Sequence, residues 1–360
     1  ARRVSNALII TYTMMVHLDY VAQTQTTLQA QDIQSDVYDD TVPEPSDSSI
    51  DAGVAIVRQG DYDAIIALGG GSPIDSAKAI GILGKFGGVI RDYKFPRQVN
   101  EEGLPIIAIP TTAGTGSEAT KFTIITDEAN NEKLLCVGIG FMPVATIIDY
   151  TLTLSVPPRT TADTAIDAMS HAIEAYVSHK RNPYSDQQAL AALRLIGPTI
   201  KQVYHHGKDE QARAMMMLGA SLAGIAFCNS SVALVHGMSR PIGAFFHVPH
   251  GLSNAMLLPA VTEFSIPAAP ERYADCARAL GIATASDSDE QANQALIAFL
   301  KDLNQELQVP SLAEFGAKHE EFEQLVELMC EQAFASGSPN NNPRVPSKEE
   351  MLAIYRSLWA

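Results

Sequence analysis

Continuous apolar runs alternate with amphipathic stretches over the first part of the chain, up to about residue 149. The predicted elements are strands at residues 7–11, from 36, 64–68 and 104–109, and helices at 20–30, 49–59 and 73–83. Strands that are apolar throughout, and separated by helices, are typical of a parallel sheet buried on both faces. The first part of the chain therefore predicts an α/β domain.

Longer amphipathic stretches take over after about residue 149. Helices are predicted at 161–178, 186–204, 211–227, 291–307, 322–334 and 348–358. The paired prolines Pro157 and Pro158 stop regular structure at the boundary, and the segment 339–346, rich in Pro and Asn, predicts a surface loop. We predict an α/β domain over residues 1–155 and an all-helical domain over 156–360.

Composition and charge exclude several classes of partner. Apolar residues make up 46% of the 360 residues, enough for two sizeable cores. The formal net charge is −16 and no basic cluster occurs, which argues against nucleic acid or an anionic membrane as a partner. No apolar run reaches about 18 residues, so no transmembrane helix is expected. Four well-separated cysteines without a CxxC pair are typical of reduced residues in a cytoplasmic protein: Cys136, Cys228, Cys276 and Cys330.

Two loops that follow predicted strands have the composition of phosphate-binding segments. Glycines at 69–71 let the backbone turn sharply, and Ser72 is predicted as the N-cap of the next helix, with Pro73 at its first position. The free N–H groups at that helix start offer a site for pyrophosphate, although a tight turn without a ligand is the alternative. The second loop, 110–118, is dense in threonine and glycine, and ligands of open α/β sheets bind where strands end.

A group of acidic and histidine residues predicts a metal site in the second domain. Asp167 and His171 lie four residues apart in a predicted helix, so both side chains reach one ion, and His236 and His250 follow. A carboxylate with three imidazoles suits Fe(II) or Zn(II), and these ligand types do not separate the two. An ordinary pair on a helix surface is the alternative for Asp167 and His171 taken alone.

Four motifs together give the chain a resemblance to the iron-containing (group III) alcohol dehydrogenases. They are GGGSPIDSAKAI at 69–80, IPTTAGTGSEAT at 109–120, DAMSHAIEAYVS at 167–178 and VHGMSRPIGAFFHVPHGLSNAMLLP at 235–259. The resemblance implies a Rossmann-like domain followed by a helical domain, the dehydroquinate synthase-like architecture. It also implies a homodimer that transfers hydride between a small alcohol, aldehyde or hydroxy acid and NAD or NADP. Metal ligation is implied for Asp167, His171, His236 and His250.

The same resemblance implies which residues contact the dinucleotide. They are Gly70, Gly71, Ser72, Asp75, Thr111, Thr112, Thr115, Thr120 and Lys133.

The chain departs from the family pattern at three places. Tyr12 stands where members that prefer NAD usually have an Asp, so NADP is less strongly excluded. Arg240 stands where many members have a His linked to proton release; a guanidinium does not shuttle protons but would bind a substrate carboxylate. His247 is then a candidate proton carrier, with a packing or solvent-facing role as its alternative. An N-terminal strand or hairpin usual in the family is absent from the sequence.

Two other functions fit the same motifs. One is a glycerol dehydrogenase-like or maleylacetate reductase-like enzyme that uses Zn(II) or no metal. The other is a non-catalytic protein that binds a dinucleotide or a metal, against which the complete ligand set beside two phosphate loops argues.

Overall fold

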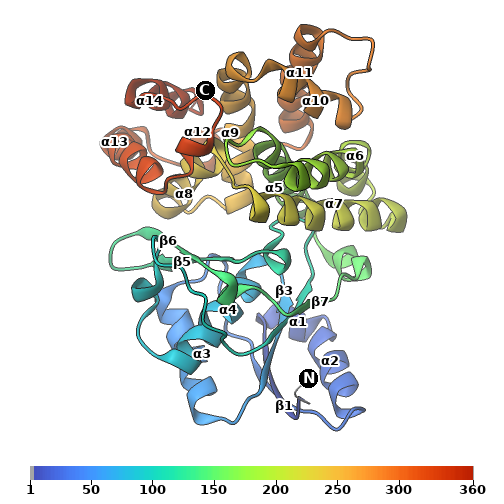
Figure 1. Cartoon of the computed structure of the whole chain (residues 1–360), viewed down its shortest axis with the longest axis vertical. Coiled ribbons are helices and arrows are strands. Elements are labelled where there is room, and N and C mark those ends of the chain that lie inside the picture. Colours follow the sequence, from blue (N-terminus) through green and yellow to red (C-terminus); the bar gives the residue numbers. More distant parts are fainter. Residues whose placement is uncertain (1–3, 360) are drawn as a thin grey trace. The chain divides into compact units, whose positions relative to one another are not determined.

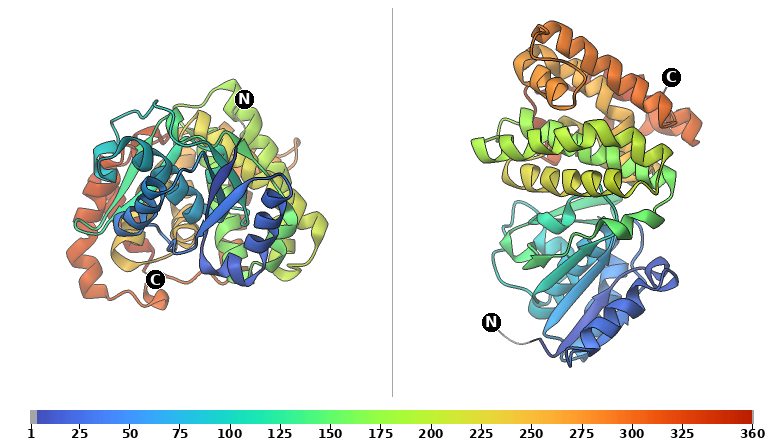
Figure 2. Two further views of the ribbon diagram at one scale, coloured as in Figure 1. Left: turned by 90° about the horizontal axis from the view of Figure 1, so that it is seen from below. Right: turned by 90° about the vertical axis from the view of Figure 1, so that its right-hand side faces the viewer.

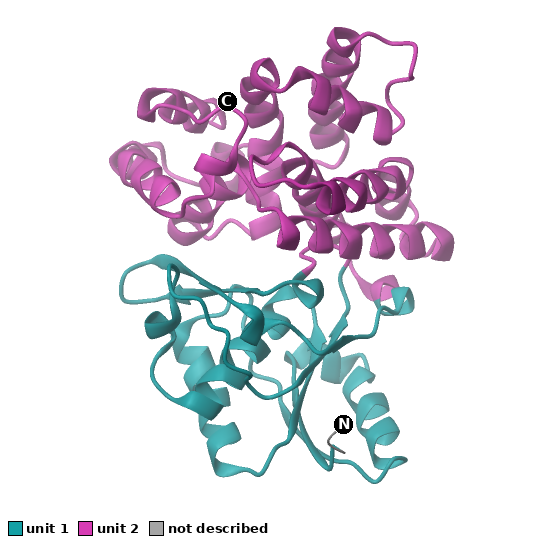
Figure 3. Ribbon diagram, viewed as in Figure 1, with its two compact units in different colours: residues 1–112, 117–152 teal, residues 113–116, 153–360 magenta. Residues whose placement is uncertain are grey.

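The computed structural model describes residues 4–359 and divides them into two compact units (Figure 3). Unit 1 holds the chain up to Thr112 together with residues 117–152, and unit 2 holds residues 113–116 and the chain from Thr153. Residues 1–3 and 360 of the two predicted domains lie outside the described residues. The predicted fold class, an α/β domain with a parallel sheet followed by a helical domain, is confirmed.

Unit 1 is built on a five-stranded sheet of order β2-β1-β3-β4-β7, in which every pair is parallel (Figures 1 and 2). Its strands are β1 (Asn6–Ile10), β2 (Gln34–Tyr38), β3 (Ala64–Gly69), β4 (Ile106–Pro110) and β7 (Ala145–Thr146), and its helices are α1 (Thr13–His17), α2 (Tyr20–Gln29), α3 (Asp47–Gln59) and α4 (Gly71–Phe86). From β1 the chain passes to β2 on one side and then to β3 on the other, so the strand order reverses between β1 and β3. Ligands are expected at the carboxyl ends of these two strands.

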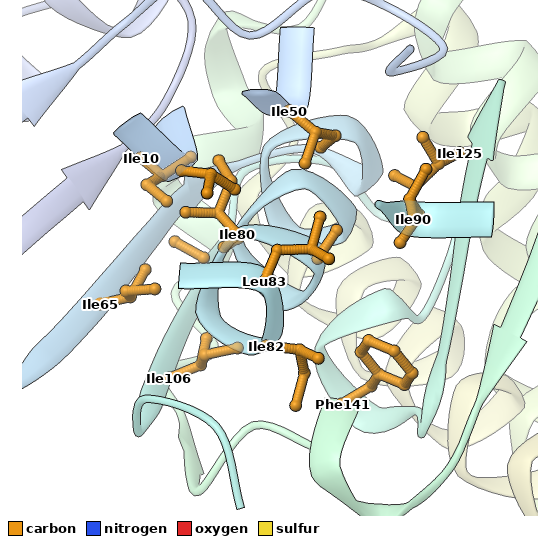
Figure 4. Packing of buried hydrophobic residues seen from close by; sticks show 14 of the residues in the cluster. Ile10, Ile50, Ile65, Ile80, Ile82, Leu83, Ile90, Ile106, Ile125 and Phe141 are labelled. Carbon is orange, nitrogen blue, oxygen red and sulfur yellow. The ribbon is translucent and has the colours of Figure 1, made fainter. Parts of the chain in front are cut away.

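Two apolar clusters lie on opposite faces of the sheet. On β1, Leu8 and Ile10 belong to the larger cluster, whereas Ala7 and Ile9 belong to the smaller one. Figure 4 shows Ile10 and Ile65 of the sheet beside Ile80 and Leu83 of α4 in the larger cluster. Successive side chains of a strand point to opposite faces, so strands that are apolar at every position require this double burial.

A hairpin that the sequence did not predict extends unit 1. Its strands, β5 (Phe122–Asp127) and β6 (Glu132–Val137), pair antiparallel with each other and not with the main sheet. The ammonium of Lys78 on α4 is buried beneath it and donates to the carbonyl oxygens of Ser117 and Phe122 and to the hydroxyl groups of Ser117 and Thr120. This lysine therefore fixes the second loop and the start of the hairpin from inside.

Unit 2 is helical throughout. Its helices are α5 (Pro158–Val177), α6 (Pro183–His205), α7 (Glu210–Asn229), α8 (Leu234–Phe246), α9 (His250–Ser265), α10 (Pro270–Ala279), α11 (Asp289–Glu306), α12 (Leu312–Phe315), α13 (His319–Ala335) and α14 (Lys348–Ser357). Helices α5, α6 and α7 pack side by side (Figure 1). Within the described residues, α7 alone is long and apolar enough to span a membrane, but most of it is buried inside the unit, as in a core helix.

Three details of the prediction are wrong. The helix after the first loop has Gly70, not Ser72, as its N-cap and begins at Gly71, because glycines meet the backbone demands of this turn without a capping side chain. Pro158 does not stop regular structure but opens α5, since the first helical position needs no N–H. The segment 339–346 is not a surface loop: Pro339, Asn341 and Asn342 are buried.

Candidate metal centre

The four predicted metal ligands converge within unit 2. Each of Asp167, His171, His236 and His250 offers one ligand atom, and these atoms all lie within 4.8 Å of one another. Oδ1 of Asp167 lies 3.3 Å from Nε2 of His236, 3.7 Å from Nε2 of His250 and 3.8 Å from Nδ1 of His171. The carboxylate thus stands within reach of all three imidazoles.

The helices of unit 2 explain how residues so distant in sequence meet. Asp167 and His171 lie one turn apart on the buried face of α5, and His236 lies in the first turn of α8. His250 is the first residue of α9, which packs against both α5 and α8. The first three residues are buried, whereas the side chain of His250 remains 29% exposed, so the group is accessible from the His250 side.

Glu174, which the sequence analysis missed, orients His236. Its Oε2 lies 2.6 Å from Nδ1 of His236, and its Oε1 accepts the backbone N–H of Val235 at 2.6 Å. A carboxylate in this position holds the proton on Nδ1 and leaves Nε2, which faces Asp167, free for a metal. The signal was present in the sequence, since Glu174 falls seven residues after Asp167, on the same face of α5.

The protonation of the group follows from burial and from the two carboxylates. Burial lowers the pKa of His171 to about 3, so this imidazole is neutral. Burial opposes the charge on His236 as well, yet Glu174 and Asp167 outweigh it and raise the pKa of His236 to about 9. Burial alone would raise the pKa of Asp167, but the three histidines hold it well below its ordinary value. Asp167 is therefore an anion.

These residues fit a first-row metal ion. Donors about 2.1 Å from a tetrahedral metal lie about 3.4 Å apart, close to the separations of Asp167 from His236 and His250. Nδ1 of His171 is buried and has no hydrogen-bond partner in the described part of the chain, as a nitrogen reserved for a metal would be. Phe227 stacks on the ring of His171 at 4.3 Å between centroids and fixes its plane.

Asn254 is a further residue of the group that was not predicted. Its Nδ2 donates to Oδ1 of Asp167 at 2.7 Å and lies 3.1 Å from Nε2 of His236 and 3.3 Å from Nε2 of His250. The amide nitrogen thus lies next to the three atoms that a metal would contact, while its own Oδ1 has no partner in residues 4–359. Asn254 lies one turn after His250 on α9, and this spacing could have placed it beside the ligand group from the sequence.

The two predicted nucleotide loops meet at one edge of the sheet in unit 1. Gly69 at the end of β3 pairs with Pro110 at the end of β4, so the loops start side by side. A Cβ on Gly70 would lie 3.2 Å from Oγ1 of Thr112, which shows how closely they approach. Thr111 carries a buried Oγ1 that has no partner in the described chain. This edge offers helix-start N–H groups and hydroxyl groups to a ligand.

Comparison with known proteins decides the family. The chain matches the model of "Iron-containing alcohol dehydrogenase" over residues 1–150 and that of "Fe-containing alcohol dehydrogenase family, C-terminal" over residues 161–359. The chain belongs to the iron-containing alcohol dehydrogenase family. The predicted family and the prediction of an NAD(P)-dependent oxidoreductase that acts on CH–OH groups are thereby confirmed.

Individual family members are similar over most of their length. The chain is 36% identical to the NADPH-dependent butanol dehydrogenase of Clostridium saccharobutylicum and 36% identical to the NAD-dependent methanol dehydrogenase of Bacillus methanolicus. Each match covers 88% of this chain and 82% of the relative. The solved structure of a 1,3-propanediol oxidoreductase superposes with a TM-score of 0.93 at 33% identity, covering 99% of this chain and 92% of the other.

Several residues with predicted family roles bond to the protein itself. Asp75 accepts from the Ser117 hydroxyl and, at 3.0 Å, from the backbone N–H of Ile124. Thr120 is buried beside Lys78. Lys133 lies on β6 and forms an ion pair with Glu44. Ser72 accepts the N–H of Glu44 at 3.3 Å. Gly70, Gly71 and Thr112 lie at the meeting point of the loops, and Thr115 belongs to unit 2.

The positions at which this chain departs from the family pattern are also resolved. Tyr12 lies two residues after the end of β1, as the N-cap of α1, and lies against Gly69 of the glycine loop. Arg240 lies one turn after His236 on α8. His247 is the exposed C-cap of α8, with a left-handed backbone at φ 55°. No bond from its ring to the ligand group is found within residues 4–359, so its role as a proton carrier remains a prediction.

Proposed function

We propose that the protein transfers hydride reversibly between the carbinol carbon of a small alcohol and NAD or NADP, with a divalent metal held by Asp167, His171, His236 and His250. The observation that carries this proposal is the convergence of these four side chains in a geometry that suits a tetrahedral ion. Fe(II) is the metal named by the family, and Zn(II) suits the same donors. When bound, the metal supplies Lewis acidity toward the substrate oxygen.

The chain's own residues prepare this site. Glu174 keeps the proton of His236 on Nδ1, Phe227 fixes the plane of His171, and Asp167 contributes a negative charge that offsets part of the charge of a cation. The dinucleotide is proposed to bind at the loop edge of unit 1, with its phosphates on the N–H groups around Gly70 and Gly71 and its sugar hydroxyl groups near Thr111 and Thr112. The other predicted contacts, including Thr115, stay proposals.

The proposed hydride acceptor is either NAD or NADP. The two similar dehydrogenases named above use one cofactor each, and Tyr12 places no carboxylate at the end of β1 to repel a 2′-phosphate. Domains at 1–155 and 156–360, a homodimer and a cytoplasmic location complete the proposal. The four cysteines are free and buried, which agrees with a reducing compartment.

Replacement of His250 tests the proposed function. We expect His250→Ala to lose bound metal and the ability to form NADH or NADPH with small primary alcohols, because one of four ligands is removed. His17→Ala, which removes an exposed histidine of unit 1, is the matched control and should retain both. Metal content and turnover are measured on the same samples. A His250→Ala protein with one metal per chain and full turnover would overturn the assignment.

A further inference from the structure

Arg240 carries a charge that the rest of the protein leaves almost unpartnered. Its Nη1 donates to Oγ of Ser338 at 3.2 Å, and its Nε is buried without a partner. A guanidinium has five N–H donors, so a single neutral acceptor leaves most of them unused. No carboxylate lies within ion-pair distance of Arg240 in the part of the chain that the structure describes.

Two other arginines of unit 2, the buried Arg213 and the partly buried Arg272, have more partners. Arg213 donates from its three nitrogens to the carbonyl oxygens of Gly207 and Val156 and to the hydroxyl group of Thr161. Arg272 pairs with Asp186 and donates twice to the carbonyl oxygen of Tyr176. Withdrawing a guanidinium from water costs free energy unless its N–H donors are satisfied, and Arg240 lacks the partners that Arg213 and Arg272 have.

The position of Arg240 relates it to the metal centre. It lies four residues after His236 on α8, and therefore on the same helix face. Burial lowers its pKa to about 10, partly offset by Glu174, so it stays cationic at neutral pH. The carboxylate of Glu174 is already engaged by Val235 and His236 and cannot pair with Arg240 fully. A divalent metal and Arg240 together carry three positive charges, and Asp167 and Glu174 carry two negative ones. One net positive charge therefore remains.

A buried strap holds Ser338 against Arg240. Pro339 packs on Gly237 of α8, and the side chain of Asn341 donates to Ser231 and to the carbonyl oxygen of Val232. Ser338 is 4% exposed, and its hydroxyl oxygen accepts the Arg240 bond. No acceptor for the hydroxyl proton of Ser338 occurs within residues 4–359, so this proton is available to an anion. Arg240 remains partly exposed and can be reached.

We propose that Arg240 and Ser338 form a subsite for a carboxylate group of the substrate, which makes the substrate a small hydroxy acid and the product the corresponding oxo acid. The planar guanidinium matches a carboxylate with two parallel hydrogen bonds, and the hydroxyl group of Ser338 adds a third. The inference rests on the proposed function, because it names the class of alcohol that the same metal centre would oxidise.

The test compares acids with neutral alcohols of the same shape. Metal-loaded protein is assayed for kcat/KM with glycolate, β-hydroxypropionate and γ-hydroxybutyrate against isobutanol, isoamyl alcohol and isohexanol. Arg240→Met should lower kcat/KM for the preferred acid by about 10- to 100-fold and leave its neutral counterpart little changed. Ser338→Ala should lower it by about 3- to 10-fold. Arg194→Met removes an exposed arginine of α6 and is the matched control.

Binding and stability supply readouts that do not depend on turnover. Butyrate, which has no hydroxyl group, should bind metal-loaded wild-type protein more tightly than it binds Arg240→Met in calorimetry. Arg240→Met should unfold at no lower temperature than wild type, because an unpartnered charge is removed. Wild type without preference for acids, or Arg240→Met that impairs both classes equally, would overturn the subsite and leave the dehydrogenase intact. Failure of both substrate classes in metal-loaded wild type would contradict the proposed function itself.

Discussion

Glu174→Gln is the substitution that examines how the metal centre is held. The glutamate accepts two N–H groups, from Val235 and from Nδ1 of His236, each at 2.6 Å, and it is only 2% exposed. Glutamine has almost the same shape, but its amide accepts through one oxygen only. In one arrangement the NH2 group of the glutamine faces the N–H of Val235, so that two donors meet. In the other arrangement the NH2 group faces Nδ1 of His236, which must then accept, and the imidazole proton moves to Nε2. The second arrangement blocks the nitrogen that faces Asp167.

The size of the effect follows from these two bonds. Loss of a carboxylate that orients a ligating histidine costs about 10- to 100-fold in metal affinity. In the absence of metal, the free energy of unfolding should also fall by about 1–3 kcal/mol, because one buried polar group of Val235 or His236 is left without a hydrogen-bond partner. We therefore expect a variant that folds, unfolds at a lower temperature and binds Zn(II) more weakly than wild type.

The assay is competition for Zn(II) with a chromophoric chelator. Because Glu174 raises the pKa of His236 to about 9, protons compete with the metal at neutral pH, and wild-type affinity should fall as the pH drops below that value. The two proteins are therefore compared at about pH 10, above the pKa of His236, where this competition is small. Glu271→Gln, at an exposed position of α10, is the matched control. Equal affinities of wild type and Glu174→Gln would refute the role given to this carboxylate.

Three further predictions concern packing and burial. Gly224→Ala should destabilise by about 1–3 kcal/mol in chemical denaturation, since its Cβ would lie 2.8 Å from Cα of Gly116. Gly243→Ala on α8 should cost less, because its Cβ would lie 3.3 Å from one atom, the carbonyl oxygen of Val248. Lys78→Met should lower the free energy of unfolding by about 3–5 kcal/mol, because it leaves buried acceptors unpaired. Lys85→Met removes an exposed lysine of the same helix and should change stability little; similar losses for both variants would contradict this role of Lys78. The four cysteines should resist iodoacetamide at pH 8.5 until the protein unfolds, because all are buried, and rapid labelling of native protein would argue against this burial. Burial raises the pKa of Cys136 to about 12, so above about pH 9 this thiol ionises in the unfolded chain and not in the folded one, and the free energy of unfolding should fall.

Regular elements were predictable wherever the apolar pattern was long and continuous. The strands β1, β3 and β4 are apolar at nearly every position because both faces of the sheet are buried, as Leu8 and Ile9 on opposite faces illustrate. The hairpin β5–β6 was missed, since it is stabilised by its own pairing and by the buried Lys78 rather than by a long apolar run. The strap near Pro339 was misjudged because Pro and Asn suit turns, and only tertiary contacts such as those of Asn341 bury it.

The grouping of Asp167, His171, His236 and His250 was predictable from residue types and from helical spacing, with the resemblance supplying His236 and His250. Its surroundings were not. Glu174 and Asn254 acquire meaning only once α8 and α9 bring His236 and His250 to α5. Arg240 was recognised as a departure from the family pattern, but its lack of a carboxylate partner became visible only in the structure. Polar side chains of this kind depend on neighbours that are distant in sequence.

Removal and return of the metal test the central claim most directly. Purified protein is stripped with a chelator, divided, and reloaded with Fe(II) or Zn(II) before NADH or NADPH formation is followed with small alcohols and hydroxy acids. The account predicts no turnover in stripped protein and recovery of turnover with one of the two ions, in proportion to the metal bound at Asp167, His171, His236 and His250. Full turnover by exhaustively stripped protein would contradict it.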